Sequence, residues 1–108
     1  MIYEHRTYTV LPGKMDALQA RFRDHTVRLF KKHDMKVVGY FTPVIAKANN
    51  IFIFILEFRD LAHREAAWAA FGADPEWQKA FADSHKDGVI VESVENMILA
   101  PTDFSPLK

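Results

Sequence analysis

One short segment limits the folds open to this chain more than any other: residues 51–58 read Ile-Phe-Ile-Phe-Ile-Leu-Glu-Phe. Such a run of β-branched and aromatic residues predicts a strand, whose side chains alternate between two faces. The isoleucines then share one face, and Phe52, Phe54, Leu56 and Phe58 share the other. An antiparallel sheet with one face in water shows apolar residues only at every second position. We therefore expect both faces of this strand to be buried.

The rest of the chain supplies few residues to cover a second sheet face. A length of 108 residues suits one domain, because two separate cores would each be too small. Large apolar side chains left in water cost about 1.5–3 kcal/mol each and make a surface adhesive. A second copy of the chain is the natural cover, so we predict a homodimer.

Hydrophobic periodicity and breaker residues predict one order of elements. A helix is indicated where Met15, Leu18, Phe22 and Leu29 recur at helical spacing, and further helix starts follow Asp60 and Asp74-Pro75. The predicted ranges are a strand at 2–11, a helix at 14–33, strands at 35–44 and 51–59, helices at 60–71 and 74–87, and a strand at 89–99. This βαββαβ order predicts an α+β, ferredoxin-like fold, a four-stranded antiparallel sheet with helices on one face. Two such sheets packed face to face would form a dimeric α/β barrel.

We predict a single domain over residues 1–108, with a core at 1–100 and a C-terminal tail at 101–108. In the tail, Phe104 lies between Pro101 and Pro106, and Leu107 follows Pro106. The two prolines stiffen the backbone. We expect the tail to pack on its own barrel or on the partner subunit.

Composition excludes several classes of function. Fourteen basic residues balance 14 acidic ones, so nothing favours a nucleic-acid or membrane partner. The chain has no cysteine, which rules out disulfides, thiol catalysis and cysteine-ligated zinc. The N-terminus begins Met-Ile-Tyr-Glu rather than with a basic and apolar leader, so we expect a cytoplasmic protein.

A polar stripe on the first predicted strand is the main candidate site. Glu4, Arg6 and Tyr8 alternate onto one face of a mostly apolar sheet. In a functional interpretation, Arg6 holds an anionic or carbonyl oxygen while Glu4 or Tyr8 moves a proton. In a structural interpretation, Glu4 and Arg6 pair with each other or with nearby charges and only specify the dimer.

His25 is the remaining catalytic candidate. It lies near the apolar stripe of the first helix, where it would serve as a base or ligand, or would only be hydrogen-bonded at the core's rim. Arg64 and Trp68 lie four residues apart on one helix face, which favours stacking over ligand clamping. No pair of histidines has metal-binding spacing, so we expect neither a metal nor another cofactor.

Several motifs together are similar to those of NIPSNAP-family domains. They are Tyr3-Glu4-His5-Arg6-Thr7-Tyr8-Thr9 before Pro12-Gly13-Lys14, Lys32-His33 before Val37-Val38-Gly39-Tyr40, Arg64 and Trp68 before Asp74-Pro75-Glu76-Trp77, and Pro101-Thr102-Asp103-Phe104-Ser105-Pro106. The resemblance covers nearly the whole chain; Asp34 departs from it where the family often has glycine. It implies a dimeric α/β barrel, and the wider superfamily includes cofactor-free monooxygenases, haem-degrading enzymes and isomerases.

Two main hypotheses on function remain open from the sequence, and haem binding through His25 is a third possibility. The first is a small-molecule-binding dimeric barrel, with an enzyme related to the monooxygenases or isomerases as one form of it. Arg6 and Tyr8 would then orient an apolar or aromatic carbonyl compound, and Glu4 or His25 would act as base. The second is a non-catalytic dimeric binding or adaptor domain.

Overall fold

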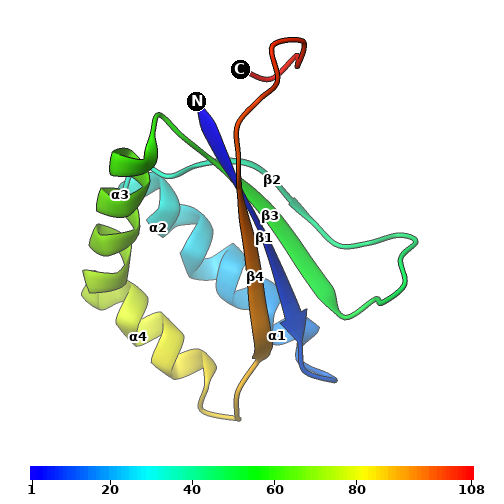
Figure 1. Ribbon diagram of the computed structural model, residues 1–108. Coiled ribbons are helices and arrows are strands. Elements are labelled where there is room, and N and C mark those ends of the chain that lie inside the picture. The colour runs from blue at the N-terminus through cyan, green and yellow to red at the C-terminus, as the bar shows by residue number, and fades with distance from the viewer.

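The computed structural model describes residues 1–108 as a single sheet with helices packed on one side (Figure 1). Its elements in chain order are β1 (Ile2–Val10), α1 (Met15–Arg21), the π-helical turn η1 (Phe22–Thr26), α2 (Val27–Lys32), β2 (Lys36–Phe41), β3 (Ile51–Phe58), α3 (Leu61–Ala73), α4 (Pro75–Ser84) and β4 (Val91–Leu99). No helix combines the length and the apolar character that crossing a membrane requires.

The four strands form one antiparallel sheet in the order β2-β3-β1-β4. The long β1 lies at the centre beside β3, and β4 forms the edge beside β1. This confirms the predicted ferredoxin-like fold. It also places the N-terminal polar stripe in the middle of the sheet, where both neighbouring strands surround it.

The core lies between the sheet and the helices. Phe52, Phe54, Leu56 and Phe58 of β3 are all buried there, as the alternation of the sequence predicts. From the helical side, Phe22 packs edge-on against the Phe54 ring, and Phe30 lies between Phe54 and Phe71. This aromatic layer holds the helices at a fixed height above the sheet.

The helix predicted over 14–33 is interrupted. Phe22–Thr26 forms a π-helical turn, in which the Thr26 hydroxyl donates to the Arg21 carbonyl oxygen at 3.4 Å. Such turns accommodate one extra residue inside a helix and are frequent at functional sites. Hydrophobic spacing does not reveal an insertion of this kind, because the apolar side chains still reach the core.

The other boundaries shift for local reasons. Asp60 and Asp74 cap α3 and α4 as predicted, accepting hydrogen bonds from the backbone of His63 and Glu76. The helix α3 runs to Ala73, beyond its predicted end at 71, and stops there because Pro75 disfavours a helical conformation for Asp74, which is extended. The second strand ends at Phe41, short of the predicted 44.

The sheet face away from the helices is left uncovered by the chain. We call it the open face; the apolar residues on it are Phe41, Ile51, Ile53, Ile55, Met97 and Leu99. The three isoleucines are partly buried, and Phe41, Met97 and Leu99 are 49%, 55% and 40% exposed. This face is the one that the sequence predicts a second copy would cover.

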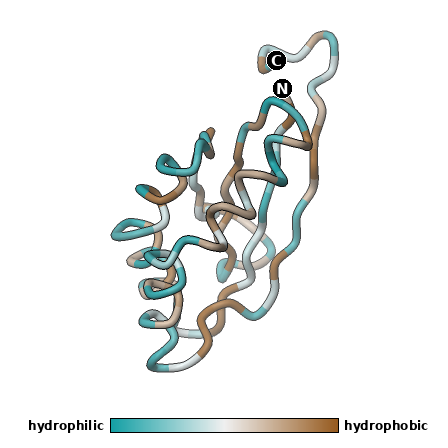
Figure 2. Tube along the Cα trace, turned by 90° about the vertical axis from the view of Figure 1, so that its left-hand side faces the viewer, coloured by the Kyte–Doolittle hydropathy of each residue, from teal (hydrophilic) through white to brown (hydrophobic).

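The tail begins beyond β4, at the end of the molecule where both chain ends lie (Figures 1 and 2). The Tyr3 hydroxyl donates to the Lys108 carbonyl oxygen at 3.5 Å, which holds the last residue near β1. The Phe104 ring, in contrast, is 83% exposed. Packing of this ring on a partner subunit stays a prediction.

Candidate functional site

The Glu4 carboxylate lies at the centre of a closed polar cluster on the helix-facing side of the sheet. Its cross-strand neighbours are Leu56 and Ile98, and its side chain is 0% exposed. We define the Glu4 cluster as Glu4, Arg6, Arg64, Trp68 and Asn96.

Five donors surround this one carboxylate. From α3, Arg64 donates through Nε at 2.9 Å and Nη2 at 3.0 Å, and Trp68 donates through Nε1 at 2.8 Å. From the sheet, Arg6 Nη1 and Asn96 Nδ2 each donate at 3.0 Å. The cluster therefore connects α3 to β1 and β4, and both oxygens of the carboxylate accept hydrogen bonds.

The electrostatics of Glu4 do not suit a proton acceptor. Burial by itself raises the pKa of its carboxyl, but the hydrogen bonds, led by those from Arg64, outweigh burial and lower the pKa to about 2. The group is thus ionised at neutral pH and holds little affinity for a proton. The ion pair between Glu4 and Arg6 fits the interpretation that these two groups pair with each other, but it lies on the helix side of the sheet and so not at the predicted dimer interface.

This lowered pKa predicts a pH dependence of stability. A carboxyl whose pKa is lower in the folded than in the unfolded protein stabilises the fold above its unfolded pKa, and that contribution is lost as pH falls towards the folded value. We expect the free energy of unfolding to decrease as pH falls from about 5 to 2. A carbon-13 NMR titration of the Glu4 carboxyl checks the cause: a midpoint near 4.5 would contradict it.

Arg6 is held by both charge and aromatic rings. Its guanidinium carbon lies 4.6 Å from the centre of the Trp68 ring and 5.6 Å from that of Tyr8, while Nη1 bonds to Glu4. Its Nε is buried without a partner. The predicted stripe is therefore on one face, as expected, but it faces the helix layer and not the open face.

Tyr8, the third member of the stripe, lies at a cleft of about 570 Å³ on the β4 side, which we call the β4 cleft. Its apolar lining comes from Phe81, Val89, Val91 and Val94, and its polar lining from Tyr8, Arg21, His85, Glu92 and Ser93. The chain segment after α4 returns here to begin β4 (Figure 1). The cleft is bounded by the sheet edge and by the last turns of α4.

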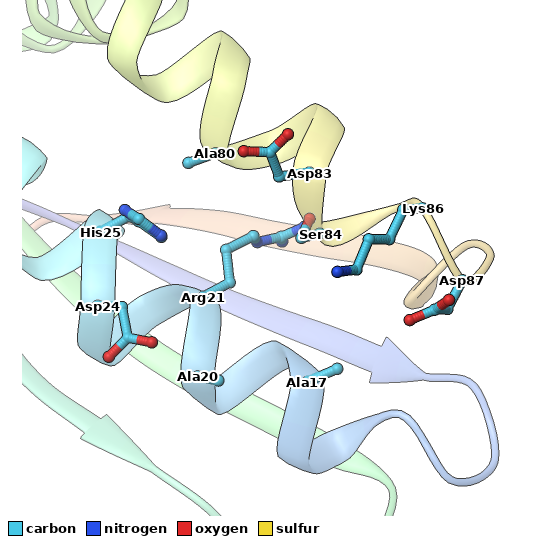
Figure 3. A pocket seen from close by; sticks show the side chains of 10 residues that line it. All are labelled: Ala17, Ala20, Arg21, Asp24, His25, Ala80, Asp83, Ser84, Lys86 and Asp87. Atoms are coloured by element: carbon cyan, nitrogen blue, oxygen red, sulfur yellow. The ribbon is translucent and has the colours of Figure 1, made fainter.

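His25 lies away from these groups. It is exposed on η1, at a hollow of about 370 Å³ between the first helix and α4, which we call the outer hollow (Figure 3). No hydrogen bond or ion pair links it to the stripe. Asp24, Asp83 and Asp87 line the same hollow, and the pKa of Asp83 is lowered mainly by its hydrogen bond and ion pair with Lys79.

Sequence reasoning missed three contributions to these sites. Asn96 donates a hydrogen bond to Glu4 only because β4 pairs with β1 in a register that places Asn96 opposite Arg6. Arg64 and Trp68 share a helix face, as predicted, but both bind Glu4. Arg21 follows Leu18 by three residues on the apolar side of α1. A charged residue at such a core position is the sequence signal that could have identified it.

The NIPSNAP family model matches residues 3–106, nearly the whole chain. The chain belongs to the NIPSNAP family. Among curated proteins, this NIPSNAP domain is 30% identical over 99 residues to Protein NipSnap homolog 3B of Mus musculus. That match covers 92% of this chain and 39% of the mouse protein, so the domain spans well under half of that relative.

Solved structures of family members share the fold over their full length. A NIPSNAP family protein from Agrobacterium tumefaciens is 30% identical with a TM-score of 0.88, covering 99% of this domain and 98% of that chain. A NIPSNAP domain protein from Burkholderia xenovorans is 25% identical with a TM-score of 0.85, covering 98% and 99%. A structure described as an antibiotic biosynthesis monooxygenase is 16% identical with a TM-score of 0.62, covering 94% and 99%, which is a likeness of fold alone.

Proposed function

We propose that this NIPSNAP domain binds a small apolar or aromatic molecule in the β4 cleft. The observation that carries the proposal is the cleft itself, where four apolar side chains meet a phenol and a guanidinium. Its volume of about 570 Å³ falls in the range of ligand sites, which combine apolar walls with few polar groups. Tyr8 and Arg21 would orient a carbonyl oxygen of the ligand.

In this proposal the Glu4 cluster is the support of the site and not its chemistry. It fixes the position of β1, and with it Tyr8, relative to α3 and β4. Arg6 bonds to Glu4 and lies over the Trp68 ring, so it supports the cleft from the side of the Glu4 cluster.

A cofactor-free enzyme, of monooxygenase or isomerase type, is the second candidate. The observation that favours it is that Tyr8 and His85, two groups able to transfer a proton, line the same cleft. Sharing a fold with an antibiotic biosynthesis monooxygenase is compatible with such chemistry but does not specify it. A non-catalytic binding or adaptor domain would use the cleft for binding alone.

We also propose that the working form is a cytoplasmic homodimer, joined through the open face. The exposed or partly exposed apolar side chains on that face come from β2, β3 and β4, and His5, Thr7 and Thr9 of β1 lie between those of β3 and β4. Burial of such a surface against an identical one is the usual solution for a two-fold dimer. Each copy would keep its own β4 cleft, because the cleft opens on the helix side.

The binding proposal is tested with an uncharged aromatic ketone, 2-acetylnaphthalene, titrated into the protein while backbone amide shifts are followed by NMR. We expect saturable shifts concentrated at residues of the β4 cleft. Val94→Glu places a charge against the apolar wall and should abolish them, since burial of an unpaired charge is unfavourable.

The matched control is Val44→Glu, at a fully exposed loop residue, which should bind as the wild type does. Shifts that are absent, or that lie at the open face instead, would contradict the proposed site.

A further inference from the structure

Arg21 is a buried cation without an anionic partner. Its side chain belongs to α1, is 6% exposed and points towards α4 (Figure 3). The one hydrogen bond it makes runs from Nη1 to the Ser84 hydroxyl at 3.3 Å, and its Nε is buried without any partner. Four other arginines, Arg6, Arg28, Arg59 and Arg64, each form an ion pair with a carboxylate.

The surroundings of Arg21 compensate only a small part of the free-energy cost of burying its charge. Its guanidinium carbon lies 5.5 Å from the centre of the Trp77 ring and 5.3 Å from that of Phe81. Aromatic faces attract a cation, but more weakly than a carboxylate does. A guanidinium keeps its proton in proteins, so the charge remains and its remaining donors are available.

An anion has one favourable route to this guanidinium. On the side of the outer hollow, the three carboxylates of Asp24, Asp83 and Asp87 outnumber the one lysine, Lys86, so the lining there disfavours an anion. On the side of the β4 cleft, the walls are mostly apolar and Glu92 is the one carboxylate, with no ion pair to Arg21. Burial lowers the pKa of the Arg21 guanidinium, and the Tyr8 phenol lies close enough to oppose this shift electrostatically. A ligand entering by the cleft would meet a cation at its inner end and apolar side chains around its body.

We infer that Arg21 is the anion-binding group of the β4 cleft and that the ligand is an apolar or aromatic carboxylate. This inference rests on the proposed function and narrows the ligand class from a carbonyl compound to an acid. The flat fork of a guanidinium matches the two oxygens of a carboxylate. One guanidinium with one neighbouring phenol suits a single negative charge better than the double charge of a phosphate monoester.

The test compares two probes of the same shape, 2-naphthoate and the uncharged 2-acetylnaphthalene, by NMR titration of the wild-type protein. We expect 2-naphthoate to bind in the β4 cleft at least about tenfold more tightly, as charge-assisted hydrogen bonds allow. Equal affinities would overturn the assignment to a carboxylate and leave the proposed cleft standing. Failure of both probes to bind there would overturn the proposed function itself.

Two variants then locate the anion-binding group. Arg21→Met keeps an unbranched side chain in the core and removes the guanidinium with its charge, so 2-naphthoate should lose about tenfold or more in affinity while 2-acetylnaphthalene changes little. Arg23→Met removes an exposed charge only two residues along the same helix and should alter neither affinity. Equal losses in both variants would mean that general electrostatic attraction, and not Arg21, holds the acid. The wild-type comparison decides the ligand class even if Arg21→Met does not fold.

Discussion

Glu4→Gln is expected to lower the free energy of unfolding by about 3–5 kcal/mol, the cost of breaking a buried ion pair on one side. Glutamine has nearly the same shape but carries no charge, so the Arg6 guanidinium would lose its counter-ion and Arg64 would keep only its ion pair with Glu65. Its amide nitrogen would also face donors that now point at a carboxylate oxygen. Urea denaturation monitored by tryptophan fluorescence measures the change.

A control on the neighbouring strand separates the cluster from a general effect of charge. Glu95 is an exposed carboxylate of β4, so Glu95→Gln should change stability by less than about 0.5 kcal/mol. If Glu4→Gln were as stable as the wild type, the cluster would not hold the fold together. If Glu4→Gln lost ligand binding while its stability stayed unchanged, Glu4 would have the functional role in the site that the sequence first indicates.

Ile53→Lys is expected to convert the protein from dimer to monomer. Ile53 lies on the open face, with Thr7 of β1 and Phe41 of β2 as its cross-strand neighbours. A lysine there would have to bury an unpaired ammonium group in an apolar interface, which is strongly unfavourable. Sedimentation velocity distinguishes the two forms, and circular dichroism verifies that the fold remains.

The control for this variant is Leu61→Lys, which adds the same charge at an exposed residue of α3, on the helix side of the sheet. It should remain a dimer. A monomeric wild type, or an Ile53→Lys protein that stays dimeric, would contradict the open face as the interface.

Much of the fold could be predicted because its signals are local. The alternation of isoleucine and phenylalanine in β3 identifies the strand and both its faces without any tertiary knowledge. Asp60 and Asp74 are helix caps that act within three residues of themselves. The π-helical turn could not be predicted, because an extra residue in a helix leaves the apolar spacing almost unchanged.

The candidate site was predicted only in part, because its meaning depends on contacts between distant segments. That Glu4, Arg6 and Tyr8 share a face follows from strand geometry, but which face the helices cover does not. The contact between Glu4 and Asn96 spans 92 residues, and it alone brings β4 into the cluster. Arg21 and Ser84 likewise meet only when α4 packs on α1. Such pairings follow from the tertiary fold and from no short motif.

The most direct measurement is a crystal structure of the protein grown with 2-naphthoate. We expect two copies joined through their open faces, each with the naphthalene ring between Phe81 and the valines of the β4 cleft. The carboxylate should lie about 2.7–2.9 Å from the Arg21 guanidinium nitrogens, as in other charge-assisted hydrogen bonds. A β4 cleft that is empty, or filled by side chains of the neighbouring copy while the probe lies elsewhere, would contradict the proposed function.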